Sequence, residues 1–328
     1  MHKNALVLGK FMPLHLGHLA LVNFAAGLAE RLTILLCVEA TEPLPGNDRE
    51  RWLRATYANH PHITIRRVDY NDADLPATSV SSRAVSELWT ARLRRWVPSA
   101  DLIVGSENYV RYVSESWGIN YRIFDLARHQ VSISATQIRG NPYRFRHLIA
   151  PAARPDFVQR IVLHGTESTG KSTLVARLAE HFSTIFVPET AREVVEHTDT
   201  VVFSDLHRIA DRQAEAIRKA TSLADGVLFI DTDYYTTLAY ARYLFNRELP
   251  PRPEWLTTAE HDLCLYCTAD APYVQDGTRL NPARRLQLDG FHRRARAESD
   301  VRTVEVSGED WGSRMEMAVS VCEELLRF

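Results

Sequence analysis

The stretch Gly165-Thr166-Glu167-Ser168-Thr169-Gly170-Lys171-Ser172-Thr173 decides the fold of the second half of the chain. It fits the pattern G-x-x-x-x-G-K-[ST] at every fixed position, and it joins an apolar run at 160–163 to an amphipathic stretch at 171–181. A strand, a glycine-rich loop and a helix in this order present backbone N–H groups and the positive helix end to phosphate. The sequence therefore predicts a nucleoside triphosphate site, with Lys171 on the β- and γ-phosphates and Ser172 on Mg²⁺.

Acidic residues follow two further strands that are expected in this half. The apolar run 227–230 leads into Asp231-Thr232-Asp233, and the run 185–187 leads into Pro188-Glu189-Thr190-Ala191-Arg192-Glu193. Because parallel strands end at one edge of a sheet, these carboxylates are expected beside the phosphate loop, where small-molecule kinases hold the metal and the acceptor hydroxyl. We expect Asp231 to bind the metal or act as general base, ahead of Glu189 and Asp233.

The rest of this half contains further regular elements and one arginine-rich stretch. Strands are expected at 263–267 and 302–306, and helices at 205–224 and 314–326. The stretch 275–296 has many arginines and little periodicity, so we expect it to be mobile. Arg279, Arg284 and Arg285 are candidates for a lid that closes over the phosphates, and the alternative is that they are solvated surface residues.

The first half alternates short apolar runs with amphipathic stretches. Strands are expected at 5–8, 33–38, 63–68, 102–104 and 121–124, and helices at 17–29, 48–59, 82–96, 108–117 and 135–139. Such alternation predicts a parallel sheet with helices on both faces. The prolines and arginines of 141–155 break the alternation. We therefore expect an α/β chain with two tandem parallel-sheet domains, residues 1–152 and 153–328.

Two histidines mark the loop after the first expected strand. The segment Gly9-Lys10-Phe11-Met12-Pro13-Leu14-His15-Leu16-Gly17-His18 places them three residues apart at a helix start, where both meet its positive end. Later, Ile133-Ser134-Ala135-Thr136-Gln137-Ile138-Arg139 brings a serine, a threonine and an arginine to another helix start. Arg139 is suited to clamp an oxyanion. Together the two segments predict a second phosphate-binding site.

Composition bounds these expectations. The chain has 328 residues, 45% hydrophobic and 24% charged, with a formal net charge of −2. This length favours two domains, and the near-neutral charge gives no sign of a nucleic-acid or membrane partner. No apolar run of about 18 residues and no secretory signal is present, so a cytoplasmic protein is expected. The Cys264-Leu265-Tyr266-Cys267 spacing has no second cysteine pair and is better explained by buried thiols than by a metal.

The H-x-G-H and I-S-x-T-x-x-R signatures are those of nucleotidyltransferases. Followed by a phosphate-loop domain, they closely resemble the NadR-type bifunctional nicotinamide mononucleotide adenylyltransferase and ribosylnicotinamide kinase. The resemblance covers nearly the whole chain, through segments 9–18, 125–128, 133–139, 165–173, 188–193 and 231–233. Some family members carry an N-terminal helix-turn-helix domain that represses transcription. Because H-x-G-H begins at residue 15, we expect no such domain and no nucleic-acid partner here.

The resemblance implies a Rossmann-like nucleotidyltransferase domain followed by a P-loop kinase domain, and two ATP-dependent reactions. The second domain would transfer the γ-phosphate of ATP to the 5′-hydroxyl of nicotinamide riboside. In the first domain, the phosphate of nicotinamide mononucleotide would attack the α-phosphorus of another ATP, giving NAD and pyrophosphate.

The resemblance also implies roles for the motif residues. The catalytic residues would be His15, His18 and Arg139 in the first domain, and Lys171, Asp231 and Glu189 in the second. ATP would contact Gly9, Lys10, Phe11, Ser134 and Thr136 in the first domain, and Gly165, Thr166, Glu167, Ser168, Thr169, Gly170, Ser172, Thr173, Arg279 and Arg284 in the second. Mg²⁺ would bind Ser172 and Asp231.

Two other interpretations stay open at this point. One is a different nucleotidyltransferase fused to a different nucleoside kinase, because neither signature identifies the base. The other is a nucleotide-sensing regulator in which one active site has decayed. Trp89, Trp117 and Trp255 are candidates to stack on a nicotinamide ring, with core packing as the alternative for each. The sequence leaves open whether the protein forms a homo-oligomer.

Overall fold

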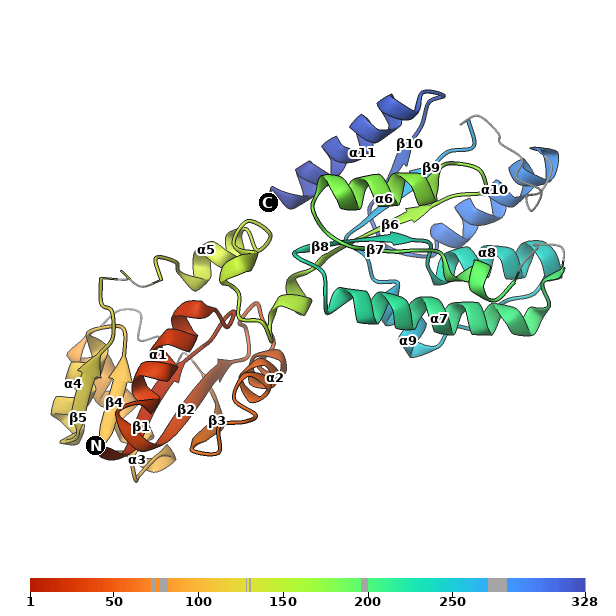
Figure 1. Cartoon of the computed structure of the whole chain (residues 1–328). Coiled ribbons are helices and arrows are strands. Elements are labelled where there is room, and N and C mark those ends of the chain that lie inside the picture. The colour runs from red at the N-terminus through yellow and green to blue at the C-terminus, as the bar shows by residue number, and fades with distance from the viewer. Residues whose placement is uncertain are drawn as a thin grey trace. The chain divides into compact units, whose positions relative to one another are not determined.

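The computed structural model describes residues 1–71, 73, 75–76, 82–127, 129, 131–195, 200–270 and 282–327. The chain divides into two compact units, Met1–Ala153 and Arg154–Phe328, so the division falls within the proline- and arginine-rich segment 141–155 (Figure 1). Each unit contains its own five-stranded sheet. The α/β class with two parallel sheets, expected from the alternation of apolar runs, is confirmed.

The first unit is a parallel sheet in the order β3-β2-β1-β4-β5. Its strands are β1 (His2–Gly9), β2 (Ala29–Glu39), β3 (Ile63–Tyr70), β4 (Leu102–Gly105) and β5 (Asn120–Ile123). Its helices are α1 (Leu16–Ala26), α2 (Gly46–Thr56), α3 (Arg83–Trp96), α4 (Tyr109–Trp117) and α5 (Ala135–Gly140), followed by the short 3₁₀ turn η1 (Arg146–Leu148). The strand order reverses between β1 and β4, which is where open α/β sheets bind their ligands.

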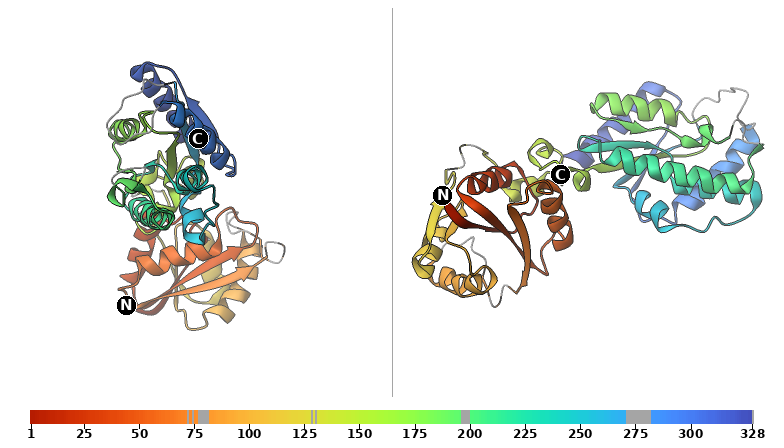
Figure 2. Two further views of the ribbon diagram at one scale, coloured as in Figure 1. Left: turned by 90° about the vertical axis from the view of Figure 1, so that its right-hand side faces the viewer. Right: turned by 60° about the horizontal axis from the view of Figure 1, so that its bottom comes forward.

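Successive side chains of a strand point to opposite faces of the sheet, so the central strands of this unit supply core residues to both faces. Leu6 and Leu8 of β1 pack with Trp89 of α3 and Val110 of α4 in one buried cluster. Helices α1 and α2 lie on the opposite face, as Figures 1 and 2 show. A sheet that is covered on both faces needs apolar residues at nearly every position of its central strands, and β4 is buried throughout.

The second unit is also a parallel sheet, in the order β10-β9-β6-β8-β7. Its strands are β6 (Gln159–His164), β7 (Phe186–Val187), β8 (Val227–Asp231), β9 (Leu263–Cys267) and β10 (Thr303–Val306). Its α-helices are α6 (Lys171–His181), α7 (Phe203–Thr221), α8 (Tyr234–Phe245), α9 (Pro253–Thr258), α10 (Pro282–Arg296) and α11 (Trp311–Leu326), with the 3₁₀ turns η2 (Arg154–Phe157) and η3 (Thr190–Glu193). Helices α6 and α11 cover one face, and α7 covers the other (Figure 1).

Three helices of the second unit were not expected from the sequence. Helices α8 and α9 follow strand β8, and α10 replaces the mobile segment that we expected around 275–296. The expectation for 282–296 was wrong because the buried face of α10 is largely polar. Arg285, Asp289, His292 and Arg296 are all buried at helical spacing and outnumber the buried apolar residues Leu288 and Ala295. The apolar stripe is therefore weak, although the helix faces the interior.

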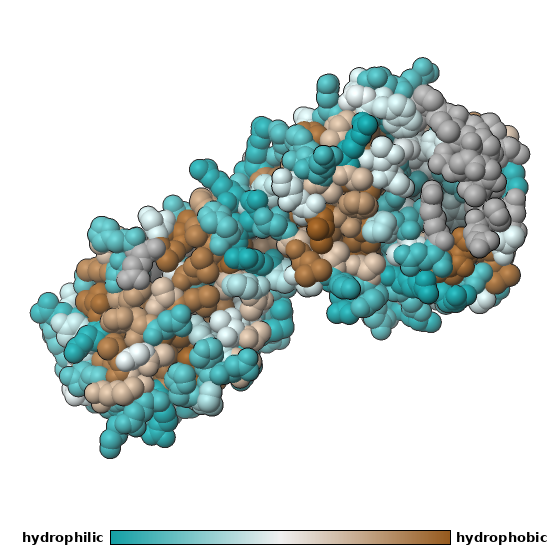
Figure 3. Space-filling view, viewed as in Figure 1, coloured by the Kyte–Doolittle hydropathy of each residue, from teal (hydrophilic) through white to brown (hydrophobic). Residues whose placement is uncertain are grey.

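The exposed surface is largely hydrophilic, and the cysteines are buried. In the space-filling view hydrophilic residues surround each unit, and hydrophobic residues are visible within the face in view (Figure 3). All four cysteines are free and buried, as expected for the pair on β9. Across the residues that the structure describes, no helix is both long enough and apolar enough to span a membrane.

Replacing Ile230 by alanine is expected to destabilise the second unit. Ile230 is fully buried on β8, so the substitution should lower the free energy of unfolding by about 2–5 kcal/mol through lost burial and a residual cavity. Urea unfolding followed by circular dichroism measures the change. Leu223→Ala is the matched control, because this leucine is 67% exposed and should change stability by less than about 0.5 kcal/mol. Equal midpoints for the two variants would contradict the assigned core.

Candidate active sites

The first candidate site is the loop between β1 and α1. His15 is the N-cap of α1, and its Nδ1 accepts a hydrogen bond from the backbone N–H of Gly17 at 3.1 Å. The backbone N–H of His15 in turn donates to Nδ1 of His18 at 3.4 Å. The two imidazole centroids lie 3.8 Å apart, so the pair predicted to share a helix face does so. Burial lowers the pKa of His18 well below its usual value, which keeps this imidazole neutral.

Two backbone features give this loop its shape. Phe11 is buried with φ of 49°, a left-handed conformation that turns the chain sharply after β1. Gly17 packs so closely on His15 that a Cβ atom there would lie 2.9 Å from the imidazole. The motif therefore requires glycine at this position, because any side chain would displace the histidine.

The late motif of the first unit meets the early one. Ser134 is the N-cap of α5, and its hydroxyl oxygen accepts the backbone N–H of Gln137. Arg139 of the same helix donates to the backbone carbonyl of Met12 and, at 3.1 Å, to the hydroxyl of Thr136. Residues 127 positions apart are thus joined at the carboxyl edge of β1, where the sequence analysis expected one shared phosphate site.

Sequence reasoning missed an ion cluster beside this loop. Glu42, almost entirely buried, lies 2.7 Å from both Nζ of Lys10 and Nη2 of Arg49. Arg49 is fully buried on α2 and also donates to the backbone carbonyl of Lys10 at 3.0 Å. A buried arginine needs such partners. The cluster holds Lys10 in place. Nothing in the sequence indicated it, because Arg49 lies among other polar residues and looks like an exposed arginine.

The second candidate site is the phosphate loop between β6 and α6. Gly165 has φ of 131° and Gly170 has φ of 80°, both conformations that favour glycine. A Cβ atom on Gly165 would lie 2.4 Å from the carbonyl oxygen of Cys267, and one on Gly170 would lie 2.3 Å from the Trp311 ring. Both glycines of the pattern are therefore required by packing as well as by backbone conformation.

A cavity of about 790 Å³ opens onto this loop. Its walls come from the loop, the starts of α6 and α11, the segment after β7, and helices α7, α8 and α10. The predicted site residues among its lining are Gly165, Glu167, Ser168, Thr169, Gly170, Lys171, Ser172, Thr173 and Glu189. A volume of this size fits small-molecule substrates.

The carbonyl groups of the phosphate loop are held by three cationic side chains. Lys171 donates to the carbonyl of Thr166 at 2.8 Å, and Arg285 donates to those of Glu167 and Ser168. Arg314 of α11 donates to the carbonyl of Thr169 at 3.3 Å. A loop that turns its N–H groups toward an anion turns carbonyls the other way, and these need donors.

The arginines of the expected lid are placed differently from one another. Arg285 is buried against the loop, whereas Arg284 is exposed and its Nε donates to the Tyr243 hydroxyl at 3.2 Å. Arg279 lies outside the described residues, as do Arg128 and the side chain of Arg192. Arg314, which sequence reasoning missed, lines the cavity and is 1% exposed. Nothing in the sequence indicated that Arg314 is buried, because the pattern of α11 is that of an ordinary amphipathic helix.

The strand ends that carry the candidate carboxylates are tied together by Gln213 of α7. Its amide nitrogen donates to the carbonyls of Asp231 and Thr232, and its oxygen accepts the N–H of Thr190 at 3.0 Å. Glu189 lines the cavity, and Asp231 is 1% exposed at the end of β8. Sequence reasoning missed Gln213, although a glutamine within the apolar stripe of α7 was a signal.

Asp233, the third acidic candidate, is engaged in structure. Its carboxylate caps α8 by accepting the N–H of Tyr235 at 2.9 Å, and it also accepts from Arg296 at 2.9 Å and contacts His261 Nε2 at 3.1 Å. Burial alone would raise its pKa, but the hydrogen bond from His261 and the charge of Arg296 outweigh it and hold the pKa well below the usual range. This carboxylate is unsuited to accept a proton from a substrate.

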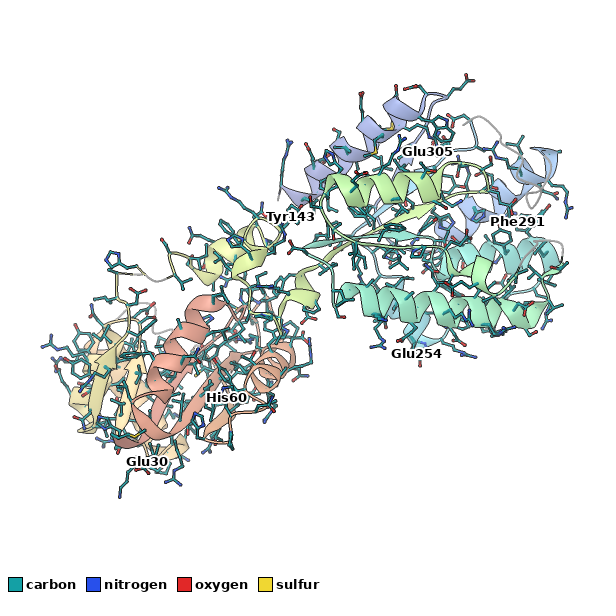
Figure 4. All side chains as sticks on the ribbon, viewed as in Figure 1. Glu30, His60, Tyr143, Glu254, Phe291 and Glu305 are labelled. Carbon is teal, nitrogen blue, oxygen red and sulfur yellow. The ribbon has the colours of Figure 1, made fainter. Side chains whose placement is uncertain are left out.

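A pair of buried histidines continues from Asp233 to the cavity. His164, the last residue of β6, has its Nδ1 3.8 Å from Asp233 and its Nε2 3.0 Å from Nδ1 of His292. Burial lowers the pKa of His164 to about 3, that of His292 well below its usual value, and that of His261 to a lesser extent. His292 lines the cavity from α10. Figure 4 labels the preceding residue, Phe291, whose ring meets that of Tyr243 at 5.6 Å.

The candidate tryptophans do not line this cavity. Trp89 and Trp255 are 2% and 1% exposed and belong to hydrophobic cores, and Trp117 packs against the same core as Trp89. The aromatic residues that do line the cavity are Tyr240, His292 and Trp311. Within the described part of the chain, no group of three histidine, cysteine or carboxylate side chains is arranged to hold a metal ion.

Comparison with known proteins covers nearly the whole chain. A family model for the AAA domain matches residues 160–314. The trifunctional NAD biosynthesis/regulator protein NadR of Escherichia coli (strain K12) is 30% identical over 347 residues, which span 98% of this chain and 82% of that protein.

Two solved structures are similar over nearly their full length. One is a NadR protein in complex with NR, with a TM-score of 0.78, 25% identity, and coverage of 99% of this chain and 96% of that one. The other is a NadR protein in complex with NAD and AMP-PNP, with a TM-score of 0.77, 24% identity, and coverage of 100% and 97%. Both units of this chain therefore have counterparts in one known protein architecture.

Mild acid is expected to destabilise the second unit through its buried histidines. The folded-state pKa values of His164, His261 and His292 lie below the usual value, so the unfolded chain takes up protons that the folded unit does not. Stability should therefore fall as the pH drops below about 6.5, by up to about 1.4 kcal/mol for each histidine at pH 5.5. Urea unfolding at several pH values tests this, and a flat profile between pH 7.5 and 5.5 would contradict it.

Proposed function

The chain belongs to the NadR family of NAD biosynthesis proteins, and we infer from this premise that its two units make NAD from nicotinamide riboside in two steps. The second unit phosphorylates the riboside with ATP, giving nicotinamide mononucleotide and ADP. The first unit then transfers the adenylyl group of another ATP to the mononucleotide, giving NAD and pyrophosphate. The observation that carries this assignment is the 30% identity to a NadR protein over 98% of the chain. It favours this pair of activities over another fusion of a nucleotidyltransferase with a kinase.

The phosphate loop supports phosphoryl transfer by the second unit. The N–H groups of the loop would surround the β-phosphate, and Lys171 would leave the Thr166 carbonyl to meet the β- and γ-phosphates. The reaction needs positioning and neutralisation of charge more than covalent chemistry. Arg285 and Arg314 contribute indirectly, because their bonds to the loop carbonyls keep the N–H groups turned toward the cavity.

Oxygen ligands for Mg²⁺ are available at the same edge of the sheet. Ser172 lines the cavity, and Asp231 ends β8 next to the loop, paired in register with Leu163 of β6. A hydroxyl and a carboxylate are the hard donors that Mg²⁺ takes alongside phosphate oxygens, so the residues fit this ion. When bound, it would neutralise charge on the β- and γ-phosphates.

Asp231 is assigned either to hold Mg²⁺ or to act as general base of the kinase step, and Glu189 is the competing residue for the base. Gln213 holds the backbone of both segments, so both carboxylates stay at the edge where the acceptor hydroxyl must lie. Asp233 is unsuitable for the reasons given above. Glu189 lines the cavity directly, which supports it as the second choice.

The first unit would perform adenylyl transfer without a covalent intermediate. The phosphate of the mononucleotide attacks the α-phosphorus of ATP, and pyrophosphate leaves. His18, His15 and Arg139 converge at the start of α1, and Lys10 lies on the same loop. The neutral imidazole of His18 donates a hydrogen bond to a phosphate oxygen, and the cationic side chains stabilise charge as the bond to pyrophosphate breaks.

Replacing Lys171 by alanine should separate the two activities. Phosphorylation of nicotinamide riboside should fall by about 10²–10³-fold, the usual effect of removing one group that stabilises developing charge. Conversion of the mononucleotide and ATP to NAD should be unchanged, because the first unit has its own sheet and phosphate site. Chromatography of the products from each substrate measures both reactions, and the exposed Lys219→Ala is the matched control. Loss of both reactions would mean that the two sites are coupled, and loss of neither would remove the loop from catalysis.

Replacing His18 by alanine should have the opposite selectivity. Adenylyl transfer should slow by about 10²–10³-fold, so that nicotinamide mononucleotide accumulates when the riboside is supplied. The exposed His62→Ala should behave like the unmodified protein. Formation of NAD at the normal rate by the His18 variant would rule out the assigned role.

Asp231→Asn and Glu189→Gln should identify the kinase base. The variant that removes the base should lose about 10²–10⁴-fold in the rate of phosphoryl transfer. We expect Asp231→Asn to show the larger loss, because its carboxylate ends the strand next to the phosphate loop. Near-normal phosphoryl transfer by Asp231→Asn together with a large loss in Glu189→Gln would move the assignment to Glu189.

A further inference from the structure

Two polar atoms in the wall of the kinase cavity lack hydrogen-bonding partners among the described residues. They are Nε2 of His292 on α10 and the hydroxyl of Thr236 on α8. Both residues line the cavity, and they are 1% and 5% exposed. A buried polar atom without a partner is unfavourable, so such a pair at a cavity wall is explained most simply by a ligand that supplies the missing bonds.

The histidine chain decides what kind of group His292 binds. We assign the proton of His164 to Nδ1, because the ionised carboxylate of Asp233 lies 3.8 Å from that nitrogen and attracts the positive end of the N–H bond. Nε2 of His164 is then an acceptor, so Nδ1 of His292 donates to it across 3.0 Å. The imidazole of His292 is neutral, which leaves Nε2 as an acceptor only. The wall therefore requires a hydrogen-bond donor from the ligand at this point.

Thr236, Tyr240 and His292 form one surface, here called the α8–α10 patch. Thr236 and Tyr240 are four residues apart on α8 and so lie on the same face of the helix. The rings of Tyr240 and His292 meet edge to face with centroids 5.6 Å apart. The Tyr240 hydroxyl donates to the Glu167 carboxylate at 2.9 Å, so this hydroxyl is already engaged. The patch thus offers an acceptor, an aromatic ring and a hydroxyl next to the phosphate loop.

We propose that the α8–α10 patch binds the ribose hydroxyl groups of the nucleoside that the kinase unit phosphorylates. This inference rests on the proposed kinase function. A sugar hydroxyl donates to Nε2 of His292, and the neighbouring hydroxyl exchanges a hydrogen bond with Thr236. The ring of Tyr240, next to His292, lies beside these contacts.

The α8–α10 patch lies next to the phosphate loop, and this position indicates that it binds the ribose of the phosphoryl acceptor rather than ATP or the nicotinamide ring. His164, which holds His292, directly precedes Gly165, and Glu167, which holds Tyr240, lies within the loop. The 5′-hydroxyl that accepts the γ-phosphate must lie against this loop, so the ribose that carries it lies there too. The ribose of ATP is separated from the γ-phosphate by the rest of the phosphate chain, and the nicotinamide ring lies beyond the acceptor's sugar.

The test combines substrate analogues with single substitutions. Nicotinamide riboside and its 2′-deoxy and 3′-deoxy analogues are compared as phosphoryl acceptors for the unmodified protein, His292→Phe and Thr236→Val. In the unmodified protein, removal of either hydroxyl should lower kcat/KM by about 10–10²-fold. His292→Phe should raise KM for the riboside and lose the discrimination against one deoxy analogue, and Thr236→Val should lose it against the other. A hydroxyl that no longer has a partner cannot contribute to specificity.

Controls separate this effect from a folding defect. Thr257→Val removes a hydroxyl from an exposed position of α9 that does not line the cavity, and it should keep full discrimination. Binding of AMP-PNP and adenylyl transfer from the mononucleotide should be normal in both test variants. Thr236→Val preserves the shape of the side chain, so it tests the proposal alone if His292→Phe fails to fold.

Each possible result has a different consequence for the patch and for the kinase function. Unchanged discrimination against both deoxy analogues in the folded variants overturns this inference but leaves the kinase function in place. Selective loss of discrimination between nicotinamide riboside and nicotinic acid riboside would assign the patch to the base and likewise overturn it. Failure of the unmodified protein to phosphorylate nicotinamide riboside would overturn the proposed function, and this inference with it.

Discussion

The buried carboxylate of Asp233 connects two of the helices that line the cavity of the second unit, α8 and α10, to the neighbouring strands β6 and β9. It caps the start of α8, accepts from Arg296 at the end of α10, contacts His261 ahead of β9 and lies near His164 at the end of β6. A carboxylate without exposure to water is stable only when cationic and N–H donors surround it. That requirement fixes helices α8 and α10 relative to the strand that leads into the phosphate loop, and with them two walls of the cavity.

The phosphate loop shows the same dependence on distant partners. Its carbonyls turn away from the site and accept hydrogen bonds from Arg285 of α10 and Arg314 of α11. These side chains stand 117 to 145 residues from the carbonyls that they bind. The loop is thus prepared for an anion by residues far away in the sequence, and α10 contributes both to the loop and to the wall that carries His292.

In the first unit, fewer long-range contacts among the described residues hold the candidate site in place. The H-x-G-H loop is joined to α5 by Arg139 and to the end of the unit by the backbone bond from Ala150 to the Leu14 carbonyl. The imidazoles of His15 and His18 pack against each other in a tilted arrangement, while the Lys10–Glu42–Arg49 cluster holds the first turn of the loop. Both units place their sites where the strand order reverses, because there the loops from neighbouring strands diverge and leave room for a ligand.

The sequence by itself determined the elements with a strong local signal and the motifs built on them. Short apolar runs predicted all ten strands of the described chain, and the glycines and lysine of segment 165–172 predicted the phosphate loop, since backbone conformation there depends on residue type. The tertiary structure alone decided which polar residues are buried. His292 and Arg314 resemble surface residues in the sequence, because a buried polar side chain is stabilised by partners far along the chain and leaves little local pattern. The sequence placed Asp233 at a strand end and Gln213 within an apolar stripe, but it could not show which partners bury them. For the same reason helix α10 was missed: its inward face is largely polar, and the carboxylate and the loop carbonyls that it meets explain why those polar side chains are buried.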